Sequence, residues 1–320
     1  MKIAIIGSGA MGCRFGVHFQ RGGADVTLYD ICKEHIDAIN DRGLKITEED
    51  GSVSYMRIPA VSSLECLGSA DAAMLQTKSS QTENALRSVL PFLSPQSIII
   101  SVQNGVGNFD VIEEIVGKDR MIIGCTLTAT TLTGLGAIRI DSFAHSDIQA
   151  LGALAEPMSV EVRDTLERGG METRVSENVF KEIWQKLSFN AAMNPITGIT
   201  RLVVGHTGAL GAETAARISE EVALVAEAEG VSIDREFALD LFRTATATEG
   251  GDFTHLTSML QDVVKERRTE ADAICGAVIG RARRHGIPVP HLETVYNLIR
   301  IIESNYPYQL SPDHPDPILS

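Results

Sequence analysis

The chain has 320 residues, a net charge of −14 and an isoelectric point near 5.0, with 44% hydrophobic and 22% charged residues. This length predicts two domains, and the composition is typical of a soluble globular enzyme. The negative charge argues against a surface for nucleic acid or anionic membrane. No run of 18 or more apolar residues, as a membrane-spanning helix requires, occurs in the sequence.

The cysteines are odd in number, scattered, and without a C-x-x-C pair, which indicates neither a zinc site nor a disulfide framework. The short apolar run at the N-terminus leads directly into a glycine turn and does not resemble a signal peptide. Together these features favour a reducing cytoplasm. The cysteines are Cys13, Cys32, Cys66, Cys125 and Cys275.

The first thirty residues predict a dinucleotide-binding unit. An apolar, β-branched strand (2–6) precedes three glycines spaced G-x-G-x-x-G, a helix (11–20) and a second strand (26–29). The first glycine allows a tight turn, the second lets a pyrophosphate approach the backbone, and the third lets the helix pack on the strand. A glycine turn without a ligand is the alternative, but the amides at the helix start are suited to a diphosphate. Cofactor contacts are expected at Gly7, Ser8, Gly9, Ala10, Met11 and Gly12.

Asp30 ends the second strand, where a ribose-binding acid belongs. A carboxylate there accepts hydrogen bonds from both adenosine ribose hydroxyls and repels a 2′-phosphate, so NAD is favoured over NADP. Lys33 lies close enough in the sequence to weaken that argument. The alternative for Asp30 is a solvated strand end.

Further along, the pattern alternates strands and helices up to residue 176 and is helical afterwards. It predicts an α/β fold: an N-terminal Rossmann-type doubly wound sheet (1–176) followed by an all-α C-terminal domain (177–320), with an irregular tail (306–320) that contains four prolines. The expected helices are 33–42, 81–90 and 158–168. The expected strands are 43–58 as short strands or a hairpin, 71–76, 97–102, a β-rich run over 121–131, antiparallel additions to the sheet at 137–141 and 147–151, and 172–175.

Polar side chains follow two of these strands, at the edge where parallel sheets bind ligands. Lys78 and Gln81 follow the strand at 71–76, and Asn104 follows the strand at 97–102. We therefore expect Lys78 and Gln81 to contact cofactor, and Asn104 to contact the nicotinamide end or the substrate. The alternatives are a solvated lysine at a helix start and a plain Asn-Gly turn.

A second polar cluster lies on the helix predicted at 177–193, where Trp184 and Leu187 are expected in the core. Its polar row, Lys186, Asn190 and Asn194, has the spacing i, i+4 and i+8 that places side chains on one helical face. A lysine among apolar neighbours has a lowered pKa and suits general acid catalysis. Pro195 is expected to end or bend the helix, and the alternative for the row is a face that meets water.

Ser258 and Glu270 stand in the next polar stretch. Glu270 is expected to open a helix that runs through residue 285 and ends at Gly286. A carboxylate in the first turn is stabilised by the helix dipole, so a purely local role is the alternative.

With these motifs assembled, the whole chain resembles the ketopantoate reductase (2-dehydropantoate 2-reductase) family. The blocks that carry the resemblance follow the glycine motif and Lys78 in order. They are Gln103-Asn104-Gly105, Trp184-x-Lys186-Leu187-x-x-Asn190-x-x-x-Asn194-Pro195, Ser258-Met259-x-Gln261-Asp262, and Arg268-Thr269-Glu270-x-Asp272 with Gly276.

The resemblance implies an NAD(P)-dependent oxidoreductase that reduces ketopantoate to pantoate, as in pantothenate biosynthesis, by hydride transfer to a 2-keto acid without a metal. It implies that Lys186 is the general acid and that Glu270 contacts the substrate hydroxyl and helps to hold the lysine. Asn104, Asn190 and Asn194 orient substrate, and Ser258 hydrogen-bonds its carboxylate. A homodimer is left open.

Two departures from the family pattern stand out. Asp30-Ile31 occupies the place where the family commonly carries an arginine for the 2′-phosphate of NADPH, which favours NADH. Cys275 stands where the family usually has an asparagine. Relatives that prefer NAD resemble D-2-hydroxyacid (mandelate-type) dehydrogenases and keep the same lysine, so that activity remains an alternative.

Two more distant alternatives are a β-hydroxyacid dehydrogenase of the 6-phosphogluconate type and a non-enzymatic nucleotide-sensing protein. The Ser258–Glu270 block argues against the first, and the presence of both Lys186 and Glu270 argues against the second.

Overall fold

The computed structural model describes residues 1–142, 144–246 and 256–309, and these residues form two compact units. The first unit contains Met1–Gln103 and Asn108–Glu182, and the second contains Asn104–Gly107 and the chain from Ile183 on. The predicted domain boundary after residue 176 stays a prediction. Of the tail predicted to be irregular (306–320), Tyr306–Tyr308 form the short 3-10 helix η7, and residues 310–320 lie outside the described residues.

The first unit is built on an eight-stranded sheet among the described residues. Neighbouring strands are parallel except β8 and β11, and Ile3 of β1 lies opposite Val26 and Ala72 of its two neighbours. The central strands are buried along their length, as expected for parallel strands covered on both faces. This confirms the predicted doubly wound sheet. In spatial order the strands are β12 (Thr173–Val175), β11 (Ser146–Ala150), β8 (Met121–Thr126), β7 (Ile98–Ser101), β6 (Ala72–Leu75), β1 (Lys2–Ile6), β2 (Asp25–Tyr29) and β5 (Ala60–Val61).

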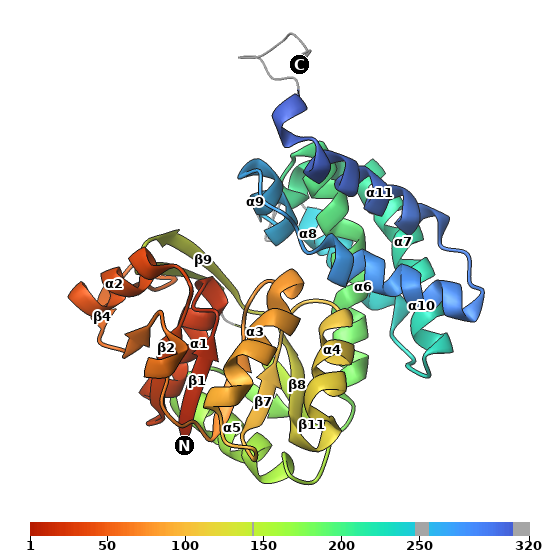
Figure 1. Cartoon of the computed structure of the whole chain (residues 1–320). Helices are drawn as coiled ribbons and strands as arrows, with labels where there is room; N and C mark the ends of the chain where they lie inside the picture. The colour runs from red at the N-terminus through yellow and green to blue at the C-terminus, as the bar shows by residue number, and fades with distance from the viewer. Residues whose placement is uncertain (143, 247–255, 310–320) are drawn as a thin grey trace. The chain divides into compact units, whose positions relative to one another are not determined.

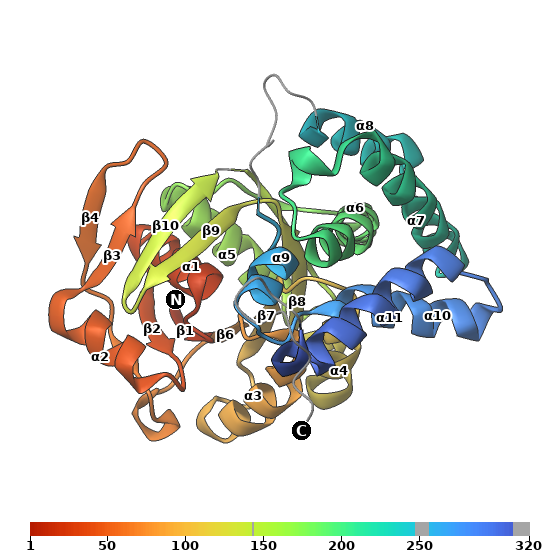
Figure 2. The ribbon, with the colours of Figure 1, turned by 90° about the horizontal axis from the view of Figure 1, so that it is seen from above.

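Helices cover both faces of this sheet, as Figure 2 shows. One face carries α1 (Ala10–Arg21) and α5 (Glu156–Arg168), and the other carries α3 (Thr82–Val89) and α4 (Gly107–Val116). The remaining helix, α2 (Lys33–Arg42), follows β2. Because β1, β6 and β7 are parallel, their carboxyl ends lie at one edge, where the glycine turn begins.

The prediction that residues 137–141 extend the main sheet is wrong. They belong to a second, four-stranded sheet, in which β10 pairs parallel with β3 and antiparallel with β9. The run predicted at 121–131 is likewise divided between the two sheets. The buried Arg14 of α1 donates to Ala129 O and Ser142 O, 2.8 Å each, and so ties both strands of the β9–β10 hairpin to the helix. The order is β4 (Val53–Met56), β3 (Leu44–Thr47), β10 (Ala137–Ser142) and β9 (Ala129–Gly134).

In its described residues the second unit is helical, as predicted for the C-terminal part. No helix in the described ranges combines the length and the apolar character needed to cross a membrane. The helices are α6 (Val179–Thr200), which begins in the first unit, α7 (Gly208–Ala228), α8 (Arg235–Thr246), α9 (Ser258–Val264), the π-helical turn η6 (Asp272–Gly276), α10 (Ala277–His285) and α11 (Pro290–Ser304).

Helix α6 does not end at Pro195 but continues to Thr200. A proline inside a helix removes the N–H that would bond the carbonyl four residues earlier, here that of Ala191. The Cys275 thiol lies 3.8 Å from Ala191 O and donates to it in place of the missing amide. The structure thus gives Cys275 a role that its position in the sequence did not suggest. An asparagine at this position could offer an N–H to the same carbonyl.

Candidate active site

The glycine turn of the first unit has the close contacts that its motif predicts. Gly7 has φ +95°, and a Cβ there would lie 2.7 Å from Thr77 N. A Cβ on Gly12 would lie 2.0 Å from Gly7 O. A Cβ on Gly9, in contrast, would meet no described atom within 4 Å. Gly7 and Gly12 are therefore needed by the fold, whereas Gly9 leaves room at the turn.

The start of α1 presents backbone donors. Gly9 is the N-cap and makes no side-chain cap, and the first backbone bond of the helix runs from Cys13 N–H to Gly9 O. The amides of residues 10–12 therefore precede the first bonded amide, at the positive end of the helix dipole. The Ser8 hydroxyl is buried and donates to Tyr29 O at 3.1 Å, so Ser8 can offer only its backbone. This cradle fits the diphosphate of a dinucleotide.

Asp30 lies just beyond β2. Its Oδ1 accepts the Cys32 N–H at 2.9 Å, which orients the carboxylate and uses one of its lone pairs. Ile31 is 83% exposed, and Lys33 pairs with Asp37 at 2.5 Å. That hydrogen bond to Asp37 also raises the pKa of Lys33. The lysine that weakened the argument from Asp30 is therefore engaged by another carboxylate.

Gln103, at the end of β7, connects the strand ends. Its buried amide donates from Nε2 to Thr77 O at 2.7 Å and to Thr82 Oγ1 at 2.9 Å, and its Oε1 accepts from Ser101 Oγ. Thr82 in turn donates to Asn108 Oδ1 at 2.9 Å. Gln103 therefore holds Thr77 against the glycine turn. The sequence singled it out only as part of a motif, and its place directly after a buried strand was the available signal.

Lys78 and Gln81 follow β6 on a short turn, in which Gln81 N–H bonds Lys78 O at 2.8 Å. Both side chains are exposed. Their predicted contacts with cofactor stay predictions.

In the second unit, the Lys186 ammonium donates to Asn104 Oδ1 at 2.9 Å, across 82 residues of sequence. Both side chains are half-buried. Gly105, with φ +85°, packs so closely on η6 that a Cβ would lie 2.2 Å from Ala273 O. The Asn-Gly turn is therefore placed by its contact with η6, and it brings the amide of Asn104 to the lysine.

Farther along α6, one buried hydrogen bond joins this helix to the residue before α9. Asn190 is half-buried, and Asn194 is buried one turn later. The Thr197 and Thr257 hydroxyls, both buried, are 2.7 Å apart, and Thr257 also caps α9 by accepting the Leu260 N–H. This bond fixes the half-buried Ser258, the next residue, near the end of the polar row on α6.

Glu270 lies two residues before the first residue of the π-helical turn η6, and α10 follows η6 up to His285, so the predicted helix is confirmed with a π-helical first part. Its carbonyl accepts the Ala273 and Ile274 N–H groups at 3.1 and 3.0 Å, and its side chain is half-buried. Through Gly105 and Cys275, η6 contacts both the Asn104 loop and α6. Lys186, Asn104 and Glu270 thus stand on elements that are packed together.

Two family profiles match the chain and together span most of it. "Ketopantoate reductase PanE/ApbA" matches residues 3–152, and "Ketopantoate reductase PanE/ApbA C terminal" matches residues 178–303. The chain belongs to the ketopantoate reductase family. It is an NAD(P)-dependent oxidoreductase that acts on the CH–OH group of a 2-hydroxy acid.

Relatives of this family member agree in length and fold. A 2-dehydropantoate 2-reductase of Streptococcus pyogenes serotype M6 is 29% identical over 308 residues, which cover 95% of this chain and 98% of that protein. A solved ternary structure of D-mandelate dehydrogenase with NADH and anilino(oxo)acetate has a TM-score of 0.89 and 29% identity, covering 95% and 99% of the two chains. A ketopantoate reductase of Ralstonia eutropha has a TM-score of 0.84 and 28% identity over the same shares.

Membership in this family removes the support for the two distant alternatives, a β-hydroxyacid dehydrogenase and a non-enzymatic sensor, because this is an oxidoreductase family that acts on 2-hydroxy acids. In the described ranges, no three histidine, cysteine, aspartate or glutamate side chains gather as a metal site would require. That the reaction needs no metal stays a prediction.

Proposed function

We propose that this member of the ketopantoate reductase family reduces ketopantoate to pantoate, with NADH as the preferred reductant. The observation that carries the proposal is the 2.9 Å hydrogen bond from Lys186 Nζ to Asn104 Oδ1, which holds a half-buried ammonium in one direction. A cation placed in this way stabilises the negative charge that develops on a keto oxygen. If ketopantoate is the substrate, the reaction supplies pantothenate biosynthesis.

The residues of the second unit would each have a separate role in the reaction. A bound nicotinamide supplies the hydride. Lys186 stabilises the developing alkoxide and donates its proton, as a general acid, and Glu270 contacts the substrate hydroxyl and helps to hold the lysine. The other polar side chains of the cluster orient the substrate: Asn104, Asn190, Asn194, and Ser258 on its carboxylate.

In the first unit, the backbone at residues 7–12 would bind the diphosphate, and Lys78 and Gln81 would contact the cofactor as well. Asn104, which belongs to the second unit, would contact the nicotinamide end or the substrate. Asp30 would accept hydrogen bonds from the ribose hydroxyls. A 2′-phosphate would meet the Asp30 carboxylate and an exposed Ile31, while the nearby Lys33 is already paired with Asp37. This supports NADH over NADPH.

The second candidate is NAD-dependent dehydrogenation of a D-2-hydroxy acid of the mandelate type. The observation that favours it is the likeness, at TM-score 0.89 over 95% of the chain, to the D-mandelate dehydrogenase solved with NADH. In both candidates Lys186 acts on the keto oxygen and the same residues bind the substrate carboxylate. The two candidates therefore differ in the side chain of the keto acid.

A rate comparison separates these candidates. Initial rates with ketopantoate, phenylglyoxylate and ketoisocaproate are measured with NADH and with NADPH. The highest kcat/KM with ketopantoate and NADH supports the proposal, and a higher value with phenylglyoxylate supports the second candidate. Activity with none of the three keto acids, in a chain that binds NADH, contradicts both.

The cofactor preference has its own test. Asp30→Ala is expected to reduce the ratio of NADH to NADPH efficiency at least tenfold, because it removes the repulsion of the 2′-phosphate and the acceptor for the ribose. Lys33→Ala is the matched control from the same loop and should leave the ratio within about twofold. An unchanged ratio in the Asp30 variant would contradict the role of that carboxylate.

Two further expectations, a homodimer and a cytoplasmic location, also stay predictions.

A further inference from the structure

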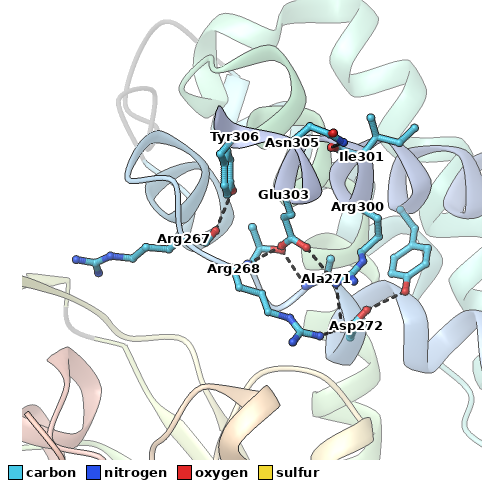
Figure 3. Close-up of polar contacts among 11 residues, drawn as sticks. Arg267, Arg268, Ala271, Asp272, Arg300, Ile301, Glu303, Asn305 and Tyr306 are labelled. Atoms are coloured by element: carbon cyan, nitrogen blue, oxygen red, sulfur yellow. Dashed lines mark hydrogen bonds and ion pairs between the residues drawn. The ribbon is translucent and has the colours of Figure 1, made fainter. Parts of the chain in front are cut away.

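A buried carboxylate on α11 lies outside the residues proposed for substrate and cofactor. The side chain of Glu303 is only 6% exposed. Its Oε1 accepts the backbone N–H of Thr269 at 2.6 Å, and its Oε2 accepts from Arg300 Nη1 at 3.1 Å (Figure 3). A hydrogen bond to an ionised acceptor is stronger than a neutral one, so Glu303 is a firm anchor for this amide.

The same guanidinium links Glu303 to a second carboxylate. Arg300 Nη1 also donates to Asp272 Oδ2 at 3.1 Å, and Asp272 accepts from Arg268 and from the Tyr296 hydroxyl at 2.8 Å each (Figure 3). Burial alone would raise the pKa of Asp272, but these donors lower it on balance. Asp272 is the first residue of η6, so the network attaches α11 to that turn.

These contacts enclose Glu270. The N–H of Thr269, one residue earlier, is held by Glu303, and the Thr269 hydroxyl accepts the N–H of Ala271, one residue later, at 3.1 Å. Thr269 and Ala271 are buried, whereas the carboxylate between them is half-buried. The backbone of Glu270 is therefore constrained on both sides, and its side chain extends from a fixed base.

We propose that Glu303 is a positioning residue that holds the Thr269–Ala271 backbone so that Glu270 is directed at the substrate and Lys186. This rests on the proposed function, in which Glu270 acts on the keto acid. Misplacement of a catalytic group by about 1 Å can cost on the order of 100-fold in rate. Loss of the anchor should therefore reduce the chemical step and leave NADH binding to the first unit unchanged.

Single variants test the anchor. Glu303→Ala should reduce kcat about 10- to 100-fold with the KM for NADH within about twofold of wild type. Glu303→Gln keeps an acceptor oxygen for the Thr269 N–H, so its kcat should stay within about threefold of wild type. Glu293→Ala is the matched control, because Glu293 lies on the same helix and pairs at the surface with Arg283. It should leave kcat and both KM values unchanged.

A double-mutant cycle distinguishes positioning from general stability. In a Glu270→Ala background, adding Glu303→Ala should change kcat by less than about twofold, because the group to be positioned is gone. If Glu303→Ala does not fold, Glu303→Asp replaces it, since its shorter carboxylate keeps the charge but withdraws from Thr269. The positioning role would be overturned if Glu303→Ala reduced kcat equally in the wild-type and Glu270→Ala backgrounds. Wild-type kcat in both Glu303→Ala and Glu303→Gln would overturn it as well. A wild-type chain inactive on every keto acid would instead overturn the proposed function.

Discussion

The glycine turn of the first unit and the polar cluster of the second are built by opposite means. The turn comes from six consecutive residues, and the groups proposed to bind a ligand are backbone amides, which any sequence possesses. The cluster takes its residues from segments far apart in the chain: Lys186 and Asn104 are joined by a hydrogen bond, and Glu270 stands on an element packed against theirs. Its groups are side chains. A backbone site depends on where side chains are absent, whereas a side-chain site depends on tertiary packing that brings the donors together.

The two regions therefore differ in how substitutions should act on them. In the turn, an added methyl group either breaks the fold or blocks the ligand, depending on the space around it. In the cluster, removal of one functional group should abolish chemistry while the fold persists, since the scaffold is made by other residues.

The largest expected effect is that of Lys186→Ala, which should reduce kcat by about 100- to 10,000-fold because the proposed general acid is removed. Lys181→Ala, an exposed lysine on the same helix, is the control and should retain full kcat. Initial rates with the best keto acid measure both. Near-wild-type turnover by the Lys186 variant would eliminate the mechanism.

The next effect compares two glycines of the turn. Gly12→Ala places a Cβ 2.0 Å from Gly7 O and should destabilise the chain by about 1–3 kcal/mol, with loss of NADH binding. Gly9→Ala meets no described atom within 4 Å, so its free energy of unfolding should stay within about 0.5 kcal/mol of wild type. Its affinity for NADH should nevertheless fall at least tenfold.

Urea denaturation and NADH titration measure the two quantities for each glycine variant. Gly280→Ala, a helical position whose added Cβ also meets open space among the described atoms, controls for the substitution itself. If Gly9→Ala binds NADH as wild type does, the cofactor does not approach the backbone at this residue.

A smaller effect concerns acid stability of the first unit. Burial lowers the pKa of His18 to about 4, although its Nδ1 lies 2.8 Å from Gly169 O, which partly offsets the shift. Between the ordinary pKa near 6.5 and pH 4 the unfolded chain binds a proton that the folded chain does not, so stability falls as the pH falls. The loss from this group should reach about 2 kcal/mol at pH 5.

His18→Asn isolates that contribution, because the asparagine amide can still donate from the position of Nδ1. Urea denaturation at pH 7 and pH 5 should show a stability loss about 2 kcal/mol smaller in the variant than in wild type. Equal losses in the two proteins would mean that His18 does not remain neutral in the fold.

The smallest effect tests the replacement of the amide missing at Pro195. Cys275→Ala leaves Ala191 O without the thiol donor and should cost about 1–2 kcal/mol. In a Pro195→Ala background the helical N–H returns, so the same Cys275 substitution should cost about 1 kcal/mol less. Denaturation of the four proteins in this cycle gives the coupling, and a coupling of zero would refute the role given to Cys275.

By itself the sequence determined the nucleotide-binding fold, because its signals are local: glycine spacing, apolar strands and an acid at a strand end. It also placed Trp184 and Leu187 correctly in the core, since the period of a helix determines which residues share a face. It failed where a decision depended on a partner distant in sequence. The hairpin at 129–142 belongs to a second sheet, where Arg14 and β3 contact it. Helix α6 continues past Pro195, where the Cys275 thiol contacts the carbonyl that lacks its helical amide.

Only the tertiary structure decided that Asn104 meets Lys186 and that Glu303 anchors the residue before Glu270. Nothing in the spacing of these residues could show it, because 82 and 34 positions separate the partners and the folded path alone sets their distance. The amino-acid sequence predicts interactions between residues that are close together along the chain. Contacts between remote segments depend on the packing of whole helices, which is a property of the fold.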